Sequence, residues 1–180
     1  MPNNQSYKKL KLDELQRISV DEFKMQEKIP VVVILDNIRS MHNVGSIFRT
    51  ADSFNIQKII LCGITPQPPH REIHKTALGA TESVDWEYVE KIETCIQELK
   101  AEKIEIIGIE QVTGSISLKD IEISNQKKYA IIVGNEVDGI SDSALKLVDY
   151  CLEIPQDGTK HSLNVSVCAG IVLWEFYNQF

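Results

Sequence analysis

The sequence predicts an α/β fold with a mostly parallel sheet flanked by helices. Five runs of strand length are apolar and rich in β-branched residues, and the stretches between them mostly show helical periodicity. Their apolar character is continuous rather than alternating, which indicates strands buried on both faces and therefore parallel neighbours. The predicted strands are Val31–Leu35, Lys58–Cys62, Ile104–Ile109, Tyr129–Val133 and Tyr150–Ile154.

A chain of 180 residues is long enough for one well-buried core and short for two. We therefore expect one domain at residues 30–180. Residues 1–29 are polar, with scattered leucines and a capping-box pair, Ser19 and Glu22, and are predicted to form a short helical extension. Because the chain lacks both a signal-peptide pattern and an apolar run of about 18 residues, we expect a cytoplasmic protein with no membrane partner.

Two amphipathic helices are predicted beside these strands. At about 100° per residue, Arg49 lies roughly 140° from Val44 on the helix after the first strand, and therefore off its core face. The last helix has a wide apolar stripe. The two stripes comprise Val44, Ile47, Phe48, Ala51 and Phe54 in the first helix, and Val165, Cys168, Ala169, Val172, Leu173 and Phe176 in the second.

Acidic residues concentrate between positions 82 and 105, which we interpret as a solvated helix face and its approach. The net charge of −7 argues against indiscriminate nucleic-acid binding. In contrast, segments 37–50, 63–76 and 155–162 hold five Lys or Arg against two acids, so they sum to +3 and the rest of the chain to −10. All four histidines fall there too. This distribution indicates a local anion-facing surface, with chance placement of polar residues in loops as the alternative.

No metal site is expected. The four cysteines lack a Cys-x-x-Cys spacing, which favours buried thiols over a disulfide or zinc site. His70 and His74 are four positions apart, but Glu72 is one position off the zinc-protease pattern, and Pro68-Pro69 favours a loop over a helix there.

Three predicted loops combine glycine with amide or acidic side chains where buried strands end. Glycine permits positive φ and a close approach of backbone to ligand. Open α/β sheets bind ligands at the carboxyl ends of their strands. Ordinary turn glycines and simple helix caps at Ser162 and Asn164 are the alternatives. Because neither G-x-G-x-x-G after the first strand nor a P-loop is present, dinucleotide or phosphate binding by those motifs is not expected.

The three loops resemble those of the SpoU (TrmH-like) branch of the SPOUT RNA methyltransferases, over about residues 30–180. The resemblance implies a C-terminal trefoil knot, S-adenosylmethionine bound in that knot, a homodimer, and methylation of a ribose 2′-hydroxyl of structured RNA, tRNA or rRNA. The matching motifs are Asn43-x-Gly45-x-x-x-Arg49, Gly134-x-Glu136-x-x-Gly139, and Ile154-Pro155-x-x-Gly158 followed by Ser162-Leu163-Asn164-Val165-Ser166.

The resemblance also implies site residues. Asn43, Arg49, Ser162 and Asn164 are expected to face the reacting hydroxyl. The cofactor is expected to lie against Gly134, Ile154, Leu163, Glu136, Gly139 and Ile109. Cationic residues of the charged segments are predicted to contact RNA, namely Arg39, His42, Arg71, His74, Lys75 and Lys160.

The family usually assigns the motif arginine as the base that removes the hydroxyl proton. A guanidinium stays protonated at ordinary pH, so we interpret Arg49 as a clamp for the adjacent phosphate that stabilises the developing alkoxide, with a base of strongly lowered pKa as the alternative.

Two features depart from the family pattern. Gln156 stands where methionine often follows the Ile-Pro pair, and the roughly 30 residues before Val31 cannot hold the separate RNA-binding domain of some relatives. We therefore expect RNA choice to come from the catalytic domain, its extension or a partner. A non-catalytic RNA-binding SPOUT protein is the alternative function, followed by a small-molecule or nucleotide-binding α/β enzyme.

Overall fold

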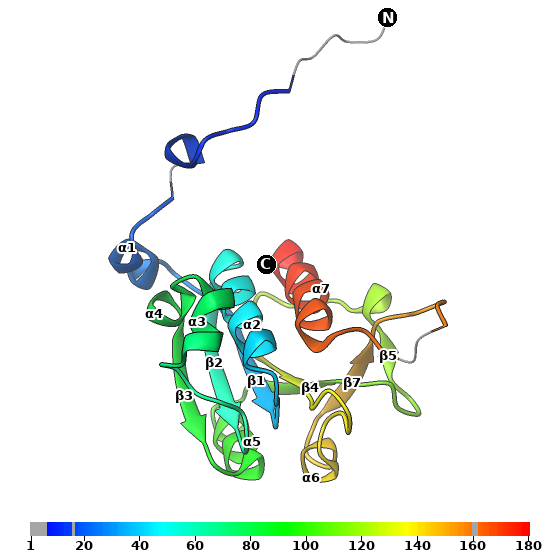
Figure 1. Cartoon of the computed structure of the whole chain (residues 1–180). Coiled ribbons are helices and arrows are strands. Elements are labelled where there is room, and N and C mark those ends of the chain that lie inside the picture. Colours follow the sequence, from blue (N-terminus) through cyan, green and yellow to red (C-terminus); the bar gives the residue numbers. More distant parts are fainter. Residues whose placement is uncertain (1–6, 16, 160–161) are drawn as a thin grey trace, which may run out of the picture.

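The computed structural model describes residues 7–15, 17–159 and 162–180, so Lys160, one of the predicted RNA contacts, lies outside the described residues (Figure 1). A 3-10 turn, η1 (Leu12–Leu15), and a short helix, α1 (Val20–Met25), precede the sheet. The predicted capping box is confirmed: the Glu22 N–H donates to the Ser19 hydroxyl at 3.2 Å, and the Ser19 N–H donates to the Glu22 carboxylate at 2.7 Å.

The described strands form one seven-stranded sheet, and every pairing between them is parallel. The predicted parallel α/β fold is therefore confirmed, and each of the five predicted strands is present within one or two residues at its ends. The spatial order is β3-β2-β1-β6-β4-β7-β5. The strands are β1 (Ile29–Asp36), β2 (Ile56–Cys62), β3 (Asp85–Val89), β4 (Glu105–Ile109), β5 (Ile116–Ser117), β6 (Tyr129–Val133) and β7 (Tyr150–Glu153).

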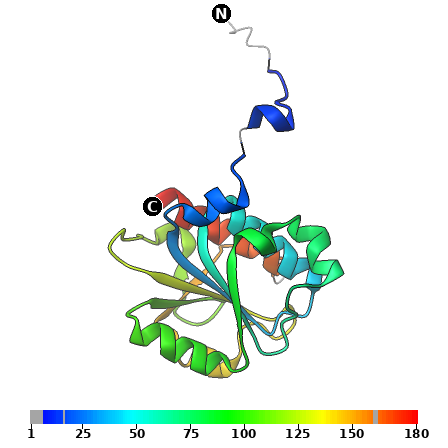
Figure 2. The ribbon, with the colours of Figure 1, turned by 90° about the vertical axis from the view of Figure 1, so that its left-hand side faces the viewer.

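Helices cover both faces of the sheet (Figures 1 and 2). One face carries α2 (Met41–Ser53), α3 (Arg71–Ala77), α4 (Ala80–Ser83), α7 (Val165–Gln179) and the 3-10 turn η2 (Leu118–Asp120). The other face carries α5 (Ile92–Ala101) and α6 (Asp142–Leu145). The sheet therefore has a hydrophobic cluster on each side, as expected for strands without a solvent face.

The central strand β1 shows how this arrangement follows from sequence. Val31, Val33 and Leu35 pack into the cluster under α2 and α7, while Val32 and Ile34 pack into the cluster under α5. β2 lies on one side of β1, and β6 followed by β4 lies on the other. The chain runs outward from β1 through β2 to β3 and then crosses to β4 on the other side of β1, so the strand order changes direction beside β1, which is where open α/β sheets bind ligands at the carboxyl ends of their strands.

Three local expectations were incomplete or wrong. The acidic stretch contains a helix, α5, but also the strand β3, where Asp85 and Glu87 are exposed and Lys58 pairs with Glu87 at 2.8 Å. An edge strand with a solvated face lacks the continuous apolar run used to find the others. The two-residue β5 is too short to show a pattern. The predicted loop around His74 is wrong, because α3 begins directly after the capping residue His70.

The trefoil knot stays a prediction. The structure places the segment that follows β7 beside the loops that follow β4 and β6, since residues of all three line one cavity. That juxtaposition is the local arrangement that the resemblance implies.

Gly45 lies where α2 packs against α3, and we expect Gly45→Ala to destabilise the fold. An added Cβ would collide with the Thr76 hydroxyl and the Ile73 carbonyl oxygen and would lie 3.1 Å from the Ala77 nitrogen. Overpacking of this kind costs about 1–3 kcal/mol. Thermal unfolding measures the effect.

Gly170→Ala is the matched control, because Gly170 is also inside a helix but has only the Thr50 Cγ2 within range, at 4.0 Å. We expect it to stabilise the fold by about 0.5–1 kcal/mol through helix propensity. Equal melting temperatures for Gly45→Ala and wild type would show that the α2–α3 contact yields readily.

Candidate active site

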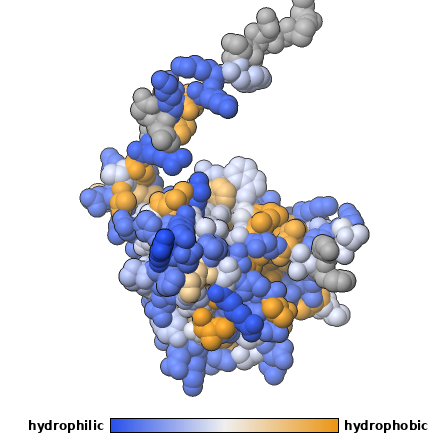
Figure 3. All heavy atoms as spheres, viewed as in Figure 1, coloured by the Kyte–Doolittle hydropathy of each residue, from blue (hydrophilic) through white to orange (hydrophobic). Residues whose placement is uncertain are grey.

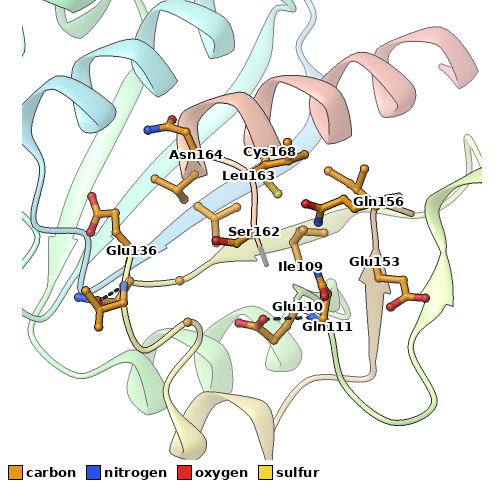
Figure 4. Close-up of a pocket in the computed structure, with 17 residues that line it drawn as sticks. Ile109, Glu110, Gln111, Glu136, Glu153, Gln156, Ser162, Leu163, Asn164 and Cys168 are labelled. Atoms are coloured by element: carbon orange, nitrogen blue, oxygen red, sulfur yellow. Dashed lines mark hydrogen bonds between the residues drawn. The ribbon is translucent and has the colours of Figure 1, made fainter. Parts of the chain in front are cut away.

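A cavity of about 350 Å³ lies at the carboxyl ends of β4, β6 and β7, beside the first residues of α7 (Figure 4). All six residues predicted to contact a cofactor line it, as do Ser162 and Asn164. Gln156, which departs from the family pattern, also lines it. The remaining lining residues are Glu110, Gln111, Val133, Asn135, Val137, Glu153, Val165 and Cys168.

The wall after β6 is a tight backbone turn. Asn135 and Gly139 exchange both backbone hydrogen bonds, at 2.9 and 3.0 Å. A Cβ on Gly134 would collide with the Gly139 carbonyl group and the Ile140 nitrogen, and Gly139 has a φ of +71°. Gly134 is therefore required by close backbone packing within this turn and Gly139 by its positive φ, and these are stronger constraints than the turn signal read from the sequence.

Glu110, which the sequence analysis missed, fixes the far end of this turn. It directly follows β4, and its carboxylate accepts the Ile140 N–H at 3.0 Å and the Gln111 N–H at 3.1 Å. A Cβ on Gly139 would collide with the same carboxylate. An acidic residue at the carboxyl end of a buried strand was the signal that could have identified it.

Asp36, also missed, supports the turn from behind. It is fully buried, and its carboxylate accepts the Ser141 N–H at 2.8 Å and the Asn37 side-chain amide at 2.7 Å. The Asn135 side chain in turn donates to the Asn37 carbonyl oxygen at 2.7 Å. The end of β1 and the loop after β6 are thus joined by bonds that leave the buried carboxylate satisfied.

Glu136 joins the cavity to the start of α2. Its carboxylate accepts the Arg39 and Ser40 N–H groups, each at 3.1 Å, and the Asn43 side-chain amide at 2.9 Å. Burial opposes its ionisation, but these hydrogen bonds outweigh burial and hold the pKa of Glu136 below its usual value. The Asn164 amide donates to the Asn43 side-chain oxygen at 3.2 Å, so residues from all three predicted motifs form one chain of hydrogen bonds.

Arg49 is not brought into this cavity. It lies on α2 six positions after Asn43, its side chain is exposed as predicted, and it forms no ion pair within the described part of the chain. Ser162 lies at the cavity in the segment that leads into α7, as Figure 4 shows. A single chain therefore gathers Asn43, Ser162 and Asn164 with the predicted cofactor residues and leaves Arg49 on the adjoining helix surface.

Carboxylates neutralise part of the predicted anion-facing surface. Arg39 lies 3.9 Å from Asp138, and both His42 and Lys75 contact Glu72, at 3.1 and 2.8 Å. The hydrogen bond from Lys75 is the main cause of a lowered pKa at Glu72. Arg71 and His74 are exposed on α3 and have no carboxylate partner among the described residues.

The charge inside the cavity has the opposite sign. Glu110, Glu136 and Glu153 line it, and no lysine, arginine or histidine does so among the residues that the structure describes. Its apolar contacts come from residues such as Ile109, Ile154 and Leu163, and the polar remainder is mainly backbone and amide. A ligand that carries positive charge and an apolar portion therefore fits this lining better than an anion does.

The cysteines are free thiols: Cys62, Cys95 and Cys151 are buried, and Cys168 is half-buried. Burial raises the pKa of Cys168 to about 11, which keeps this cavity-lining thiol protonated at neutral pH. Within the described ranges, no three His, Cys, Asp or Glu side chains group as metal ligands. None of the helices in those ranges is long and apolar enough to cross a bilayer.

Residues 30–174 match the profile of the SpoU rRNA Methylase family. The chain belongs to this family. The resemblance inferred from the three motifs is thereby confirmed, and the SpoU match covers the strands and loops that build the cavity.

Relatives of the SpoU chain include RNA-modifying proteins. The 23S rRNA (guanosine-2′-O-)-methyltransferase RlmB of Neisseria meningitidis is 33% identical over 150 residues, which are 83% of this chain and 59% of that protein. The chain thus spans about three fifths of that relative's length. The Aquifex aeolicus TrmH/SpoU tRNA modifying enzyme superposes with a TM-score of 0.79 at 25% identity, covering 89% of this chain and 80% of the other.

A ligand-bound structure is also similar. The AdoMet-bound rRNA methyltransferase of Sinorhizobium meliloti superposes with a TM-score of 0.77 at 27% identity, covering 91% of this chain and 61% of that one. A related protein with the same fold as this SpoU chain therefore binds S-adenosylmethionine.

The lowered pKa of Glu136 predicts a pH-dependent contribution to stability. A carboxylate with a folded-state pKa below its ordinary value of 4.5 stabilises the fold above that pH and loses this effect as pH falls through the folded-state pKa. We expect Glu136→Gln to be less stable than wild type in urea unfolding at pH 7, with the difference narrowing below about pH 4.5.

Glu122→Gln is the control for this measurement, since the Glu122 side chain forms no hydrogen bond or ion pair among the described residues. It should leave the urea midpoint unchanged at both pH values. A Glu136→Gln deficit that stays constant from pH 7 to pH 4 would contradict the assignment to carboxylate ionisation.

Proposed function

We propose that this chain is an S-adenosylmethionine-dependent methyltransferase that acts on a ribose 2′-hydroxyl of structured RNA, either tRNA or rRNA. The observation that carries the proposal is the hydrogen-bonded chain Glu136–Asn43–Asn164 at the rim of a glycine-walled cavity. It unites three motifs separated by about 90 and 120 positions into one site. The SpoU relatives support the reaction class.

The cavity fits the cofactor. S-adenosylmethionine supplies a methyl group already activated by attachment to a positively charged sulfur. The side chains of Ile109, Ile154 and Leu163 offer apolar contact, and the backbone turn from Gly134 to Gly139 offers hydrogen-bonding groups at close range. The three carboxylates of the lining complement its positive charge, and no lining cation opposes it.

The polar residues at the rim would position the RNA hydroxyl. Asn43 has its amide fixed by Glu136 and its oxygen by Asn164, so its orientation is set before substrate arrives. Ser162 is exposed at the same rim and can accept or donate a hydrogen bond to the ribose. Correct alignment of two reactants can supply about 7–11 kcal/mol of the barrier, which makes positioning the main contribution of these residues.

Arg49 would act on the phosphate side of the reacting nucleotide. Its guanidinium is exposed on the same helix as Asn43 and has no ion-pair partner among the residues the structure describes, so it is available to an RNA backbone. A planar fork of donors suits a phosphate and stabilises the negative charge that develops on the attacking oxygen. The general-base role remains the alternative.

We also propose that the protein is a homodimer built on α7. Trp174 stacks on Tyr177, with 5.8 Å between centroids, and Phe54 lies 5.6 Å from Trp174. Trp174 and Val167 are each 50% exposed, and Ile171 is 38% exposed. Figure 3 shows apolar side chains over this helix. A contiguous apolar face of this kind marks an interaction surface.

Arg49→Ala tests the function. We expect methyl transfer to fall by about 10²-fold or more, the usual effect of losing one transition-state electrostatic contact, while folding and S-adenosylmethionine binding persist. Tritium transfer from labelled cofactor into unfractionated cellular RNA measures the rate, and calorimetry measures micromolar cofactor binding.

Gly134→Ala, whose Cβ would collide within the turn, should lose cofactor binding.

Arg17→Ala, which removes an exposed arginine of the N-terminal segment, is the control and should methylate at the wild-type rate. Arg49→Lys separates the two roles: a clamp retains partial activity, whereas a base should shift the pH optimum downward because lysine deprotonates more readily. Wild-type rates for Arg49→Ala would remove Arg49 from the site. Absence of any cofactor binding by the wild-type chain would refute the proposed function.

Sedimentation at micromolar concentration should give the mass of a dimer, and Ile171→Arg should convert it to a monomer because a charge would be buried in the interface. Met25→Arg places the same charge at an apolar residue that is 84% exposed on α1 and should leave the dimer intact. A wild-type monomer would contradict the proposal, and a dimer unaffected by Ile171→Arg would place the interface elsewhere.

A further inference from the structure

A second cavity, of about 490 Å³, lies between α3, α4 and β3 and shares no lining residue with the active-site cavity. We propose that it binds an unstacked nucleobase of the RNA substrate, with the adjoining phosphate on Arg71. This inference rests on the proposed function. It adds a second point of RNA contact and gives the chain a means of choosing RNA within its own domain.

The floor of the pocket offers an aromatic surface. Trp86 lines it together with Pro68, Pro69 and Ile73. Trp86 is held in place by the buried ring of Phe48, which meets it edge-on at 6.5 Å between centroids and 84° between planes. Its neighbours on β3, Asp85 and Glu87, are exposed, whereas the indole of Trp86 is half-buried.

Two basic side chains lie at the rim of the pocket. Arg71 and His74 lie at the pocket and have no carboxylate partner among the described residues, whereas Lys75 on the same helix is paired with Glu72. On a chain of net charge −7, an arginine without a carboxylate partner among the described residues is an attraction for phosphate. Glu82, also at the rim, can accept a hydrogen bond from a base amino or imino group.

This combination matches a nucleotide. RNA-binding proteins recognise bases that are splayed out of the helix, by stacking them on aromatic side chains and holding the backbone with cations. The apolar floor and the Trp86 ring suit the base, and Arg71 suits the phosphate. The Glu82 carboxylate suits a base amino or imino group. An anionic lipid surface or an acidic peptide would also pair with Arg71, but the Glu82 carboxylate would repel it.

The pocket is fixed relative to the active site. The Thr76 hydroxyl of α3 donates to the His42 carbonyl oxygen of α2 at 3.1 Å, and the His42 ring contacts Glu72 at 3.1 Å. Asn43 therefore sits on a helix that is bonded to the helix forming the pocket rim. A base held at Trp86 would restrict which nucleotide of the same RNA reaches Asn43.

Tryptophan fluorescence tests the pocket directly, because the chain has two tryptophans and Trp174→Phe leaves Trp86 as the only one. In that background we expect adenosine, guanosine, cytidine and uridine 5′-monophosphates to quench the emission, and ribose 5-phosphate to have no effect. Arg71→Ala should raise the nucleotide concentration for half-quenching about tenfold. Lys119→Ala, an exposed cation on η2 near the opposite edge of the sheet, should not change it.

Methyl transfer to unfractionated cellular RNA gives the second measurement, on the otherwise wild-type chain. Arg71→Ala should raise KM for RNA about tenfold with kcat nearly unchanged, because the pocket binds ground state and transition state alike. Trp86→Phe keeps an aromatic ring and should leave KM for RNA near the wild-type value, whereas Trp86→Leu removes the ring and should raise KM; circular dichroism verifies that both variants fold.

The outcomes separate the two proposals. If wild type methylates RNA but nucleotides do not quench Trp86, or Arg71→Ala has wild-type KM, the pocket does not bind RNA and the methyltransferase function stands. If nucleotides quench Trp86 as expected but wild type transfers no methyl group to any RNA, the pocket is supported as a nucleotide site and the proposed function fails.

Discussion

The site depends on the hydrogen bonds that the Glu136 carboxylate accepts. It accepts two backbone N–H groups ahead of α2 and the amide of Asn43, so it binds the loop after β6 to the start of the helix after β1. Donors at a helix start have no partner within the helix, and an acceptor held there both satisfies them and fixes the helix direction. The position of Asn43, and through it of Asn164, follows from this contact.

Asp36 also joins two loops by hydrogen bonds, but its carboxylate is fully buried. A fully buried carboxylate is costly unless hydrogen bonds surround it, and here a backbone N–H from Ser141 and the Asn37 amide do so. Glu110 bonds Ile140 from the other side. Carboxylates at the ends of β1 and β4, together with Glu136 within the turn, therefore hold one glycine turn in place, which explains how a turn of few residues can present a defined backbone surface.

The same carboxylates divide the protein electrostatically. Three glutamates line the cavity, whereas Arg49 on α2 and Arg71 on α3 lie outside it and have no carboxylate partner in the described ranges. This division suits the proposed function, in which a positively charged cofactor and a negatively charged RNA bind at adjacent but different places. The overall charge of −7 conceals this division, because pairing of Arg39, His42 and Lys75 with acids removes much of the local excess of cations.

The sequence by itself determined the buried strands, the two apolar helix stripes and the three glycine-bearing loops, because each depends on residues close together in the chain. It did not reveal β3, whose charged face resembles a solvated helix, nor the start of α3 beside Pro69. Only the tertiary structure decided that Asp36 meets Ser141 and that Glu110 meets Ile140, partners 105 and 30 positions apart. It also decided that Trp86 and Arg71 share a pocket, because such contacts arise from strand order, which no local pattern encodes.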